Sequence, residues 1–108
     1  MFARNVSLHL KPNSLNDFTI TFGKEIIPLL RRQPGFRDEI VLVGDGTNSV
    51  TAISLWDTRE QADCYATSTY HEVLKVLAAF LDGPAKVTVM IVANSTLHRF
   101  SAACVVAA

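Results

Sequence analysis

Apolar and polar residues alternate along two stretches of the chain, residues 2–10 and 36–43, in the period-two pattern of β-strands. Two further runs, residues 50–56 and 85–93, are rich in β-branched and aromatic residues and are apolar at both alternating sets of positions. The pattern predicts four strands, of which the last two are covered on both faces. A glycine-containing connection at residues 44–48 predicts a hairpin, so the second and third strands should be antiparallel neighbours.

Between the strands the apolar residues step by three or four, as in amphipathic helices. Residues 14–32 carry such a stripe, and because proline has no amide hydrogen to donate, we expect a kink near Pro28. A second helical region follows the only tryptophan of the chain and is capped by Asp57 or Thr58. It has a weak point at residues 67–69, which predicts two helical segments there.

The predicted order is strand, helix, strand, strand, helix, strand. This is the order of the ferredoxin-like α+β fold, in which both helices cover one face of a four-stranded antiparallel sheet. We expect residues 1–100 to form one domain and residues 101–108 to form a small, apolar C-terminal tail. The bare sheet face should pack against a second copy of the chain in a homodimer. Its predicted interface residues are Phe2, Val6, Leu8, Ile53 and Leu55, and Arg4 is expected at the rim of the interface.

Composition narrows the choice of function. Ten basic residues balance ten acidic ones, which argues against a nucleic-acid or anionic-membrane surface. The central strands also lack the aromatic and basic pattern of an RNA-binding sheet. No apolar run reaches the roughly 18 residues of a membrane span, and the first ten residues lack the apolar core of a signal peptide. We therefore expect a cytoplasmic protein that binds neither nucleic acid nor membrane, and we find no metal-ligand cluster or phosphate loop.

Two motifs resemble those of a known family. The first leads into the second predicted strand, and the second ends the third predicted strand and continues into the second helical region. The residues are Gln33-Pro34-Gly35-Phe36, then Ile53-Ser54-Leu55-Trp56, followed by Asp57, Glu60, Ala62 and Tyr65. Over residues 2–93 the chain resembles the antibiotic biosynthesis monooxygenase (ABM) domains, which are dimeric α/β barrels. That superfamily includes cofactor-free monooxygenases that oxidise polyphenols to quinones, haem-degrading monooxygenases and many proteins of unknown activity.

The resemblance to the cofactor-free members is partial at the residues that matter for chemistry. Trp56 matches a tryptophan that these enzymes use. Their asparagine four residues earlier is Ala52 here, and their tyrosine six residues later is Ala62. One of three positions therefore matches.

The resemblance to the haem-degrading members is also partial. Asn5 matches their asparagine in the first strand, and Tyr65 stands where they have another aromatic residue. Lys75 stands where they have a histidine, and His71 would replace it only if the helix were shifted by about one turn. Haem binding is therefore a minor alternative, and the resemblance favours a site without a cofactor.

Together these observations predict a site between the helices and the sheet, made of Asn5, His9, Trp56, Tyr65 and His71. We expect Asn5, Ser7 and His9 to share the sheet face of Trp56. Asn5 would hold a substrate carbonyl or enolate oxygen, Trp56 and Tyr65 would orient a planar ring, and His9 or His71 would accept a proton.

The resulting hypothesis is an oxygen-dependent monooxygenase that acts on a small aromatic or polyketide-like substrate without a cofactor. The alternative is a non-catalytic, dimeric ligand-binding or stress-associated module of the same fold. Oxygen uptake distinguishes the two, because only the first consumes oxygen.

Overall fold

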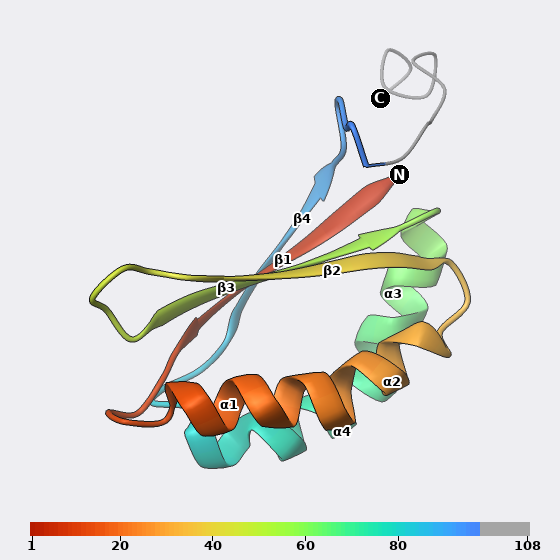
Figure 1. The fold of residues 1–108 in the computed structure, drawn as a ribbon. Helices are drawn as coiled ribbons and strands as arrows, with labels where there is room; N and C mark the ends of the chain where they lie inside the picture. The colour runs from red at the N-terminus through yellow and green to blue at the C-terminus, as the bar shows by residue number, and fades with distance from the viewer. Residues whose placement is uncertain (98–108) are drawn as a thin grey trace.

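A four-stranded antiparallel sheet with helices on one face makes up the computed structural model, which describes residues 1–97 (Figure 1). The strands, which lie in the order β2-β3-β1-β4 across the sheet, are β1 (Phe2–His9), β2 (Phe36–Val43), β3 (Ser49–Trp56) and β4 (Lys86–Ile91). Every neighbouring pair is antiparallel. The predicted ferredoxin-like α+β fold is therefore confirmed, while the predicted tail at residues 101–108 lies outside the described residues.

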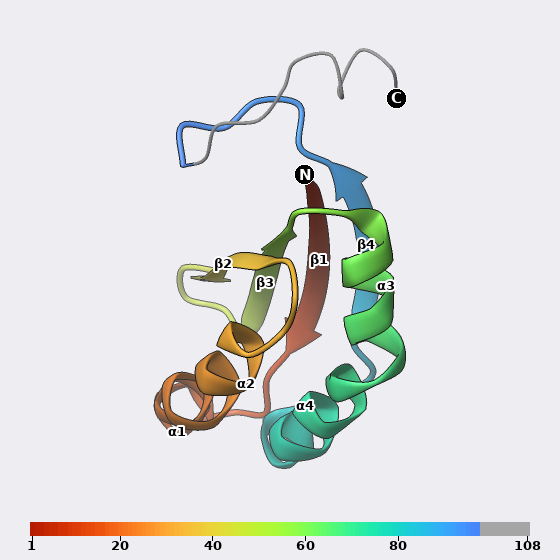
Figure 2. The ribbon, with the colours of Figure 1, turned by 90° about the vertical axis from the view of Figure 1, so that its right-hand side faces the viewer.

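Two helical regions cover the same face of the sheet. The first consists of α1 (Leu15–Thr21), η1 (Phe22–Ile26) and α2 (Ile27–Arg31), and the second of α3 (Arg59–Thr67), α4 (Thr69–Leu77) and η2 (Ala78–Phe80). Figures 1 and 2 show α1 and α4 side by side beneath the sheet. Within the described residues, none of these helices has the length and apolar character needed to cross a membrane.

The irregularity expected near Pro28 takes the form of a widened helical turn. Between α1 and α2 the chain adopts a π-helical turn, in which the amide of Ile27 donates to the carbonyl of Phe22, five residues earlier. Such turns are accommodated where the ordinary ladder is broken, as it is here because Pro28 has no amide hydrogen. The turn keeps both Phe22 and Ile26 buried against the sheet.

The second helical region begins and breaks close to the predicted positions. The hydroxyl of Thr58 accepts a hydrogen bond from the amide of Gln61 at 3.2 Å, so Thr58 caps α3. Asp57 instead accepts from the Nε of Arg37 at 2.5 Å. The helix then breaks at Ser68, whose φ of −126° and ψ of −94° are not helical. Two shorter helices, α3 and α4, can thus follow the curved face of the sheet.

The register of β1 decides which side chains face the helices. Val6 and Leu8 belong to the buried core that the helices cover, and Phe2 lies on the same face because side chains alternate with period two. The prediction that Phe2, Val6 and Leu8 line a dimer interface is therefore wrong. The other two predicted interface residues, Ile53 and Leu55, do lie on the helix-free face.

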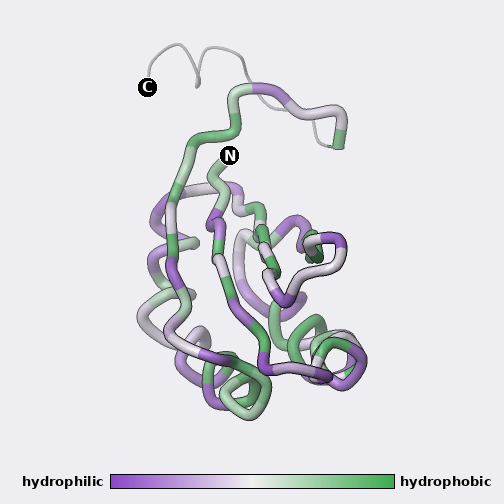
Figure 3. The backbone as a smooth tube through the Cα atoms, turned by 90° about the vertical axis from the view of Figure 1, so that its left-hand side faces the viewer, coloured by the Kyte–Doolittle hydropathy of each residue, from purple (hydrophilic) through white to green (hydrophobic). Residues whose placement is uncertain are grey.

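One edge of the sheet is uncovered. All six residues of β4 are exposed, so the prediction that this strand is covered on both faces is wrong for a single chain. On the helix side the exposed residues are apolar: Val87, Val89 and Ile91 are 40%, 37% and 44% exposed. Figure 3 shows hydrophobic residues recurring along this strand. This uncovered strip lies beside the cavity described next.

Candidate functional site

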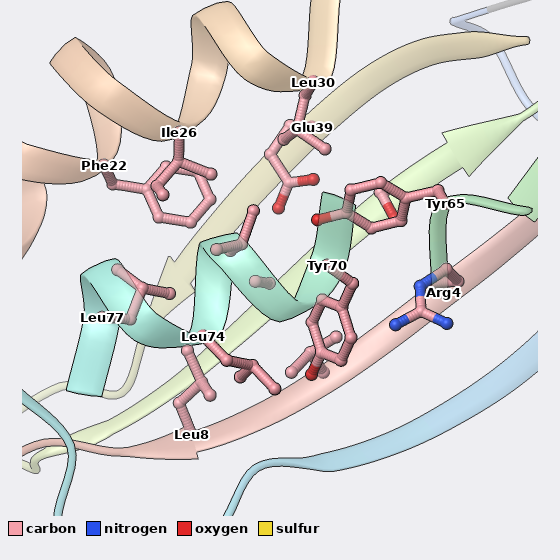
Figure 4. A pocket seen from close by; sticks show the side chains of 14 residues that line it. Arg4, Leu8, Phe22, Ile26, Leu30, Glu39, Tyr65, Tyr70, Leu74 and Leu77 are labelled. Atoms are coloured by element: carbon pink, nitrogen blue, oxygen red, sulfur yellow. The ribbon is translucent and has the colours of Figure 1, made fainter. Parts of the chain in front are cut away.

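A cavity of about 30 Å³ lies between the helices and the sheet (Figure 4). Its walls are mostly aliphatic and come from β1, β2, β3, η1, α2, α3 and α4. Against this apolar background stand five polar side chains, namely Arg4, Glu39, Ser54, Tyr65 and Tyr70. A cavity of this size accommodates a water molecule or a small ligand group rather than a whole ligand.

Arg4 is the most unusual of these residues. It is only 4% exposed, yet its Nε and Nη2 have no hydrogen-bond partner among the described residues. Its guanidinium carbon lies 4.6 Å from the ring centroid of Tyr70 and 5.5 Å from that of Tyr65, so two aromatic faces stabilise the charge. Cation–π contacts do not satisfy N–H donors, and a buried cation without an anion is costly. The arrangement therefore favours an anionic ligand.

Glu39 is the acidic side chain nearest in the sheet. It lies opposite Ser54, which in turn lies opposite Arg4, so all three project to the helix side. Burial raises the pKa of the Glu39 carboxyl from its ordinary value of 4.5 to about 8, and the charge of Arg4 acts in the opposite direction. Near pH 7 this carboxyl is mostly neutral, so it leaves most of the Arg4 charge uncompensated.

The two tyrosines contribute neutral phenols. Burial raises the pKa of both Tyr65 and Tyr70 above the usual value, with Arg4 opposing the shift. The hydroxyl of Tyr70 is buried and has no hydrogen-bond partner among the described residues. Figure 4 shows the Tyr65 hydroxyl directed toward the Glu39 carboxyl. Tyr70 is therefore a second unpaired donor beside Arg4.

Trp56 packs against this group of residues. Its ring stacks on Tyr65 with centroids 4.9 Å apart, and the edge of Phe36 closes its other side at 5.6 Å. Its indole Nε1 donates to the Ser54 hydroxyl at 2.8 Å, and the residue is fully buried. Trp56 does not line the cavity. It positions Tyr65, which does.

The structure brings together only part of the predicted site. Trp56 faces the helices as predicted, but Asn5 and His9 lie opposite Ile53 and Ser49 on the helix-free face. The prediction that Asn5, Ser7 and His9 share the face of Trp56 is wrong, because Phe2, and not Ala3, is the residue paired with Trp56. This register places every even-numbered residue of β1 toward the helices. Tyr65 is the predicted site residue that lines the cavity.

His71 also lies outside the cavity. It is exposed at the start of α4, and among the described residues no histidine or cysteine lines the cavity. A cavity of about 30 Å³ is also too small for a haem group, so it does not fit haem binding. The described residues also contain no group of three or more histidine, cysteine, aspartate or glutamate side chains arranged to hold a metal ion.

Sequence reasoning missed Glu39 and Tyr70 and misplaced Arg4. The available signal for Arg4 was a charged residue within the otherwise apolar alternating set of β1. No such signal marked Glu39, because Arg37 and Asp38 are charged as well and the irregularity between Phe36 and Asp38 sets the register of β2. Arg4 was expected at the rim of an interface, but its side chain lies in the core between two tyrosines. Only the register shows that both charges share one cavity.

The unpaired charge of Arg4 leads to a prediction about stability. Replacing it by a neutral side chain of similar length, in Arg4→Met, should raise the free energy of unfolding by about 1–4 kcal/mol, because a buried uncompensated charge is removed. Urea denaturation measures the change. The control is Arg37→Met, at an exposed ion pair, which should change stability by less than about 1 kcal/mol. A large loss of stability in Arg4→Met would show that Arg4 is a structural residue.

The raised pKa of Glu39 leads to a prediction about pH. Below about pH 4.5 both folded and unfolded chains hold this proton, whereas between pH 4.5 and 8 only the folded protein does. Stability should therefore fall as pH rises through this window, by at most about 1.4 kcal/mol per pH unit. The difference in unfolding free energy between wild type and Glu39→Gln isolates this effect, with the exposed Glu60→Gln as control. A difference independent of pH would contradict it.

Comparisons with known proteins bear on the fold. No protein-family model and no curated protein matches the sequence. Solved structures do match: a monooxygenase of Streptomyces coelicolor, determined in complex with nanaomycin D, has a TM-score of 0.73 at 17% identity and covers 91% of this chain and 92% of its own.

Two further structures have the same fold. SnoaB of Streptomyces nogalater, described as a cofactor-independent oxygenase, has a TM-score of 0.72 at 16% identity and covers 90% of this chain and 97% of its own. A protein described as an antibiotic biosynthesis monooxygenase has a TM-score of 0.68 at 17% identity and covers 85% of this chain and 98% of its own. The resemblance expected from the motifs is confirmed at the level of structure: this chain has the fold of the antibiotic biosynthesis monooxygenases.

Proposed function

We propose that this protein is an oxygen-dependent monooxygenase that acts on a small aromatic or polyketide-like substrate without a bound cofactor. The observation that carries the proposal is the pair of unpaired, buried donors, Arg4 and Tyr70, in a cavity with aromatic and aliphatic walls. Two of the neighbours in fold are described as a monooxygenase bound to nanaomycin D and as a cofactor-independent oxygenase. Those descriptions concern other proteins and support the choice of reaction class.

The side chains have complementary roles in such a reaction. Arg4 and Tyr70 donate hydrogen bonds to the oxygen of a phenol or enol and stabilise it as an anion, because both line the cavity with buried, unpaired N–H or O–H donors. Glu39, in its ionised form, takes the proton, and a pKa of about 8 is close to a working pH. Tyr65 forms an aromatic wall, which Trp56 holds in place.

The resulting anion is electron-rich and can be oxidised by molecular oxygen. The reaction takes place at a methylene carbon of the substrate, next to the ring that carries the ionised oxygen. One atom of O₂ is retained there as a carbonyl oxygen and the other leaves as water, so CH₂ and O₂ give C=O and H₂O. This balance requires no additional reductant. The chain's own residues hold the anion and move the proton.

A specific observation also favours the alternative, a ligand-binding module without catalysis. The cavity holds a head group and no more, and the described residues of its walls include no histidine or cysteine. The same donors that stabilise a reacting anion would equally hold an unreactive one. Oxygen consumption is therefore the decisive measurement.

Oxygen uptake by purified, metal-free protein over a panel of hydroquinones and anthrones tests the proposal. Arg4→Met should lower turnover by about 10²-fold, and Tyr70→Phe by about tenfold or more, because each removes a donor to the anion. Asn5→Ala, on the opposite sheet face, should leave the rate unchanged. Equal rates in all variants would remove these residues from the mechanism. Ligand binding without uptake from any substrate would establish the binding-module alternative.

We also propose that the helix-free sheet face forms a homodimer. This face carries large apolar side chains in the single chain, among them Leu42 and Met90, which are 52% and 44% exposed. An antiparallel sheet covered by helices on one face only leaves such residues for a partner. An obligate contact of this kind should bury about 2,000 Å² or more in total.

Sedimentation at micromolar concentration tests the dimer. Leu42→Lys should shift the protein toward monomer, because a charge would be placed within the interface. Ile20→Lys changes a residue of similar exposure, 47%, on α1 and should leave the oligomeric state unchanged. A monomeric wild-type protein, or equal behaviour of the two variants, would refute the proposed interface.

A further inference from the structure

A second, larger hollow lies next to the cavity described above, between α4 and β4. It has a volume of about 450 Å³, and the described residues that line it include no charged side chain. Tyr70, Leu74 and Ala78 form one wall, spaced four residues apart along one side of α4 and η2, while Val87 and Pro84 contribute to the opposite side. We call this hollow the α4–β4 groove. Its volume falls in the range of small-molecule sites, unlike that of the first cavity.

The groove and the first cavity share two side chains. Tyr70 and Leu74 line both, and both are half-buried, so one side of each faces the cavity while the other faces the groove. They lie one helical turn apart on α4, and Figure 4 shows them on the same side of the cavity. These two side chains are therefore the partition between the two spaces.

The partition can open by a turn of the Tyr70 ring. The hydroxyl of Tyr70 has no hydrogen-bond partner among the described residues, so turning the ring breaks no hydrogen bond there. A small turn of the ring would weaken its contacts with the Arg4 guanidinium and the Tyr65 ring, and an anion held by both Arg4 and the Tyr70 hydroxyl would offset this loss. Tyr70 also lies two residues after the break at Ser68, at the least regular part of this helical region.

The two spaces have complementary chemistry. The cavity offers unpaired donors and has room for a carboxylate or a single ionised oxygen, whereas the groove offers apolar surface that continues along β4 through the exposed Val89 and Ile91. A polar head and an apolar body joined in one molecule would occupy both. A compact anion would leave the groove empty, and a neutral apolar molecule would leave Arg4 unpaired.

We propose that the ligand of this protein is an amphipathic anion, with its ionised oxygen on Arg4 and Tyr70 and its apolar body in the α4–β4 groove, passing between Tyr70 and Leu74. The inference deepens the proposed function and rests on it for the location of the head group. It adds the substrate class, an anion with an extended apolar body, and it assigns selectivity for that body to the groove.

Binding of straight-chain carboxylates from butanoate to decanoate tests the proposal. Trp56 is the only tryptophan and stacks on Tyr65 beside the head-group site, so its fluorescence reports binding, and calorimetry provides an independent measurement. Affinity should rise by about fourfold for each added methylene until the groove is filled. The matched primary amides should bind at least about tenfold more weakly, because they lack the charge.

Two neighbouring alanines provide matched variants. Ala78 lines the groove, whereas Ala79 does not, and both are exposed in η2. Measured by calorimetry, because the variant adds a second tryptophan, Ala78→Trp should fill the groove, so that decanoate binds no more tightly than butanoate while the affinity for butanoate is retained. Ala79→Trp should leave the whole series unchanged. Arg4→Met should abolish the preference for carboxylates over amides.

The outcomes separate this inference from the proposed function. An affinity that does not depend on chain length in the wild type, or equal effects of Ala78→Trp and Ala79→Trp, would overturn the inference even if the protein consumes oxygen. An affinity that rises with chain length in the wild type, and no longer does so in Ala78→Trp, would support the inference even if no substrate is oxidised. In that case only the oxygenase proposal fails.

Discussion

A guanidinium group buried between two tyrosine rings is the interaction on which the rest of the site depends. Arg4 stands at the centre of the sheet, on β1, and the helices close over it. Two of its three nitrogens, Nε and Nη2, are shielded from water there, and the nearest carboxyl in the sheet, Glu39, is itself held mostly neutral by burial. The fold therefore maintains a positive charge that favours an anion within an otherwise apolar core.

The aromatic residues make this arrangement possible. Four aromatic rings form a row in which each ring contacts the next, with centroids of neighbouring rings between 4.9 and 5.8 Å apart: Phe36, Trp56, Tyr65 and Tyr70. The row starts in the sheet, continues through α3 and ends at α4, so it fixes the two helices relative to β3 and presents two rings to Arg4. Structural packing and the binding of charge thus use the same side chains, which explains why Trp56 is important without lining the cavity.

The helices occupy one face of the sheet and leave two apolar regions without a cover. The first is the helix-free face, and the second is the helix side of β4, where α4 stands off and the groove begins. The two regions differ in shape, because one belongs to an open sheet and the other is a hollow of limited volume. A flat apolar surface suits a protein partner, and a hollow next to buried donors suits a small molecule.

Local patterns in the sequence determined the elements of this protein. Four features were predicted because each depends on neighbours only a few residues away. They are the alternation in residues 36–43, the helical spacing after Pro12, the cap at Thr58 and the break before Thr69. Only the tertiary structure decided which of the two alternating sets of side chains in each strand faces the helices. Charged Arg4 stood in one alternating set of β1 and polar Asn5 in the other, so composition favoured turning Asn5 toward the helices. The pairing of Phe2 with Trp56 turned Arg4 inward instead, because strand register depends on contacts between residues more than fifty positions apart.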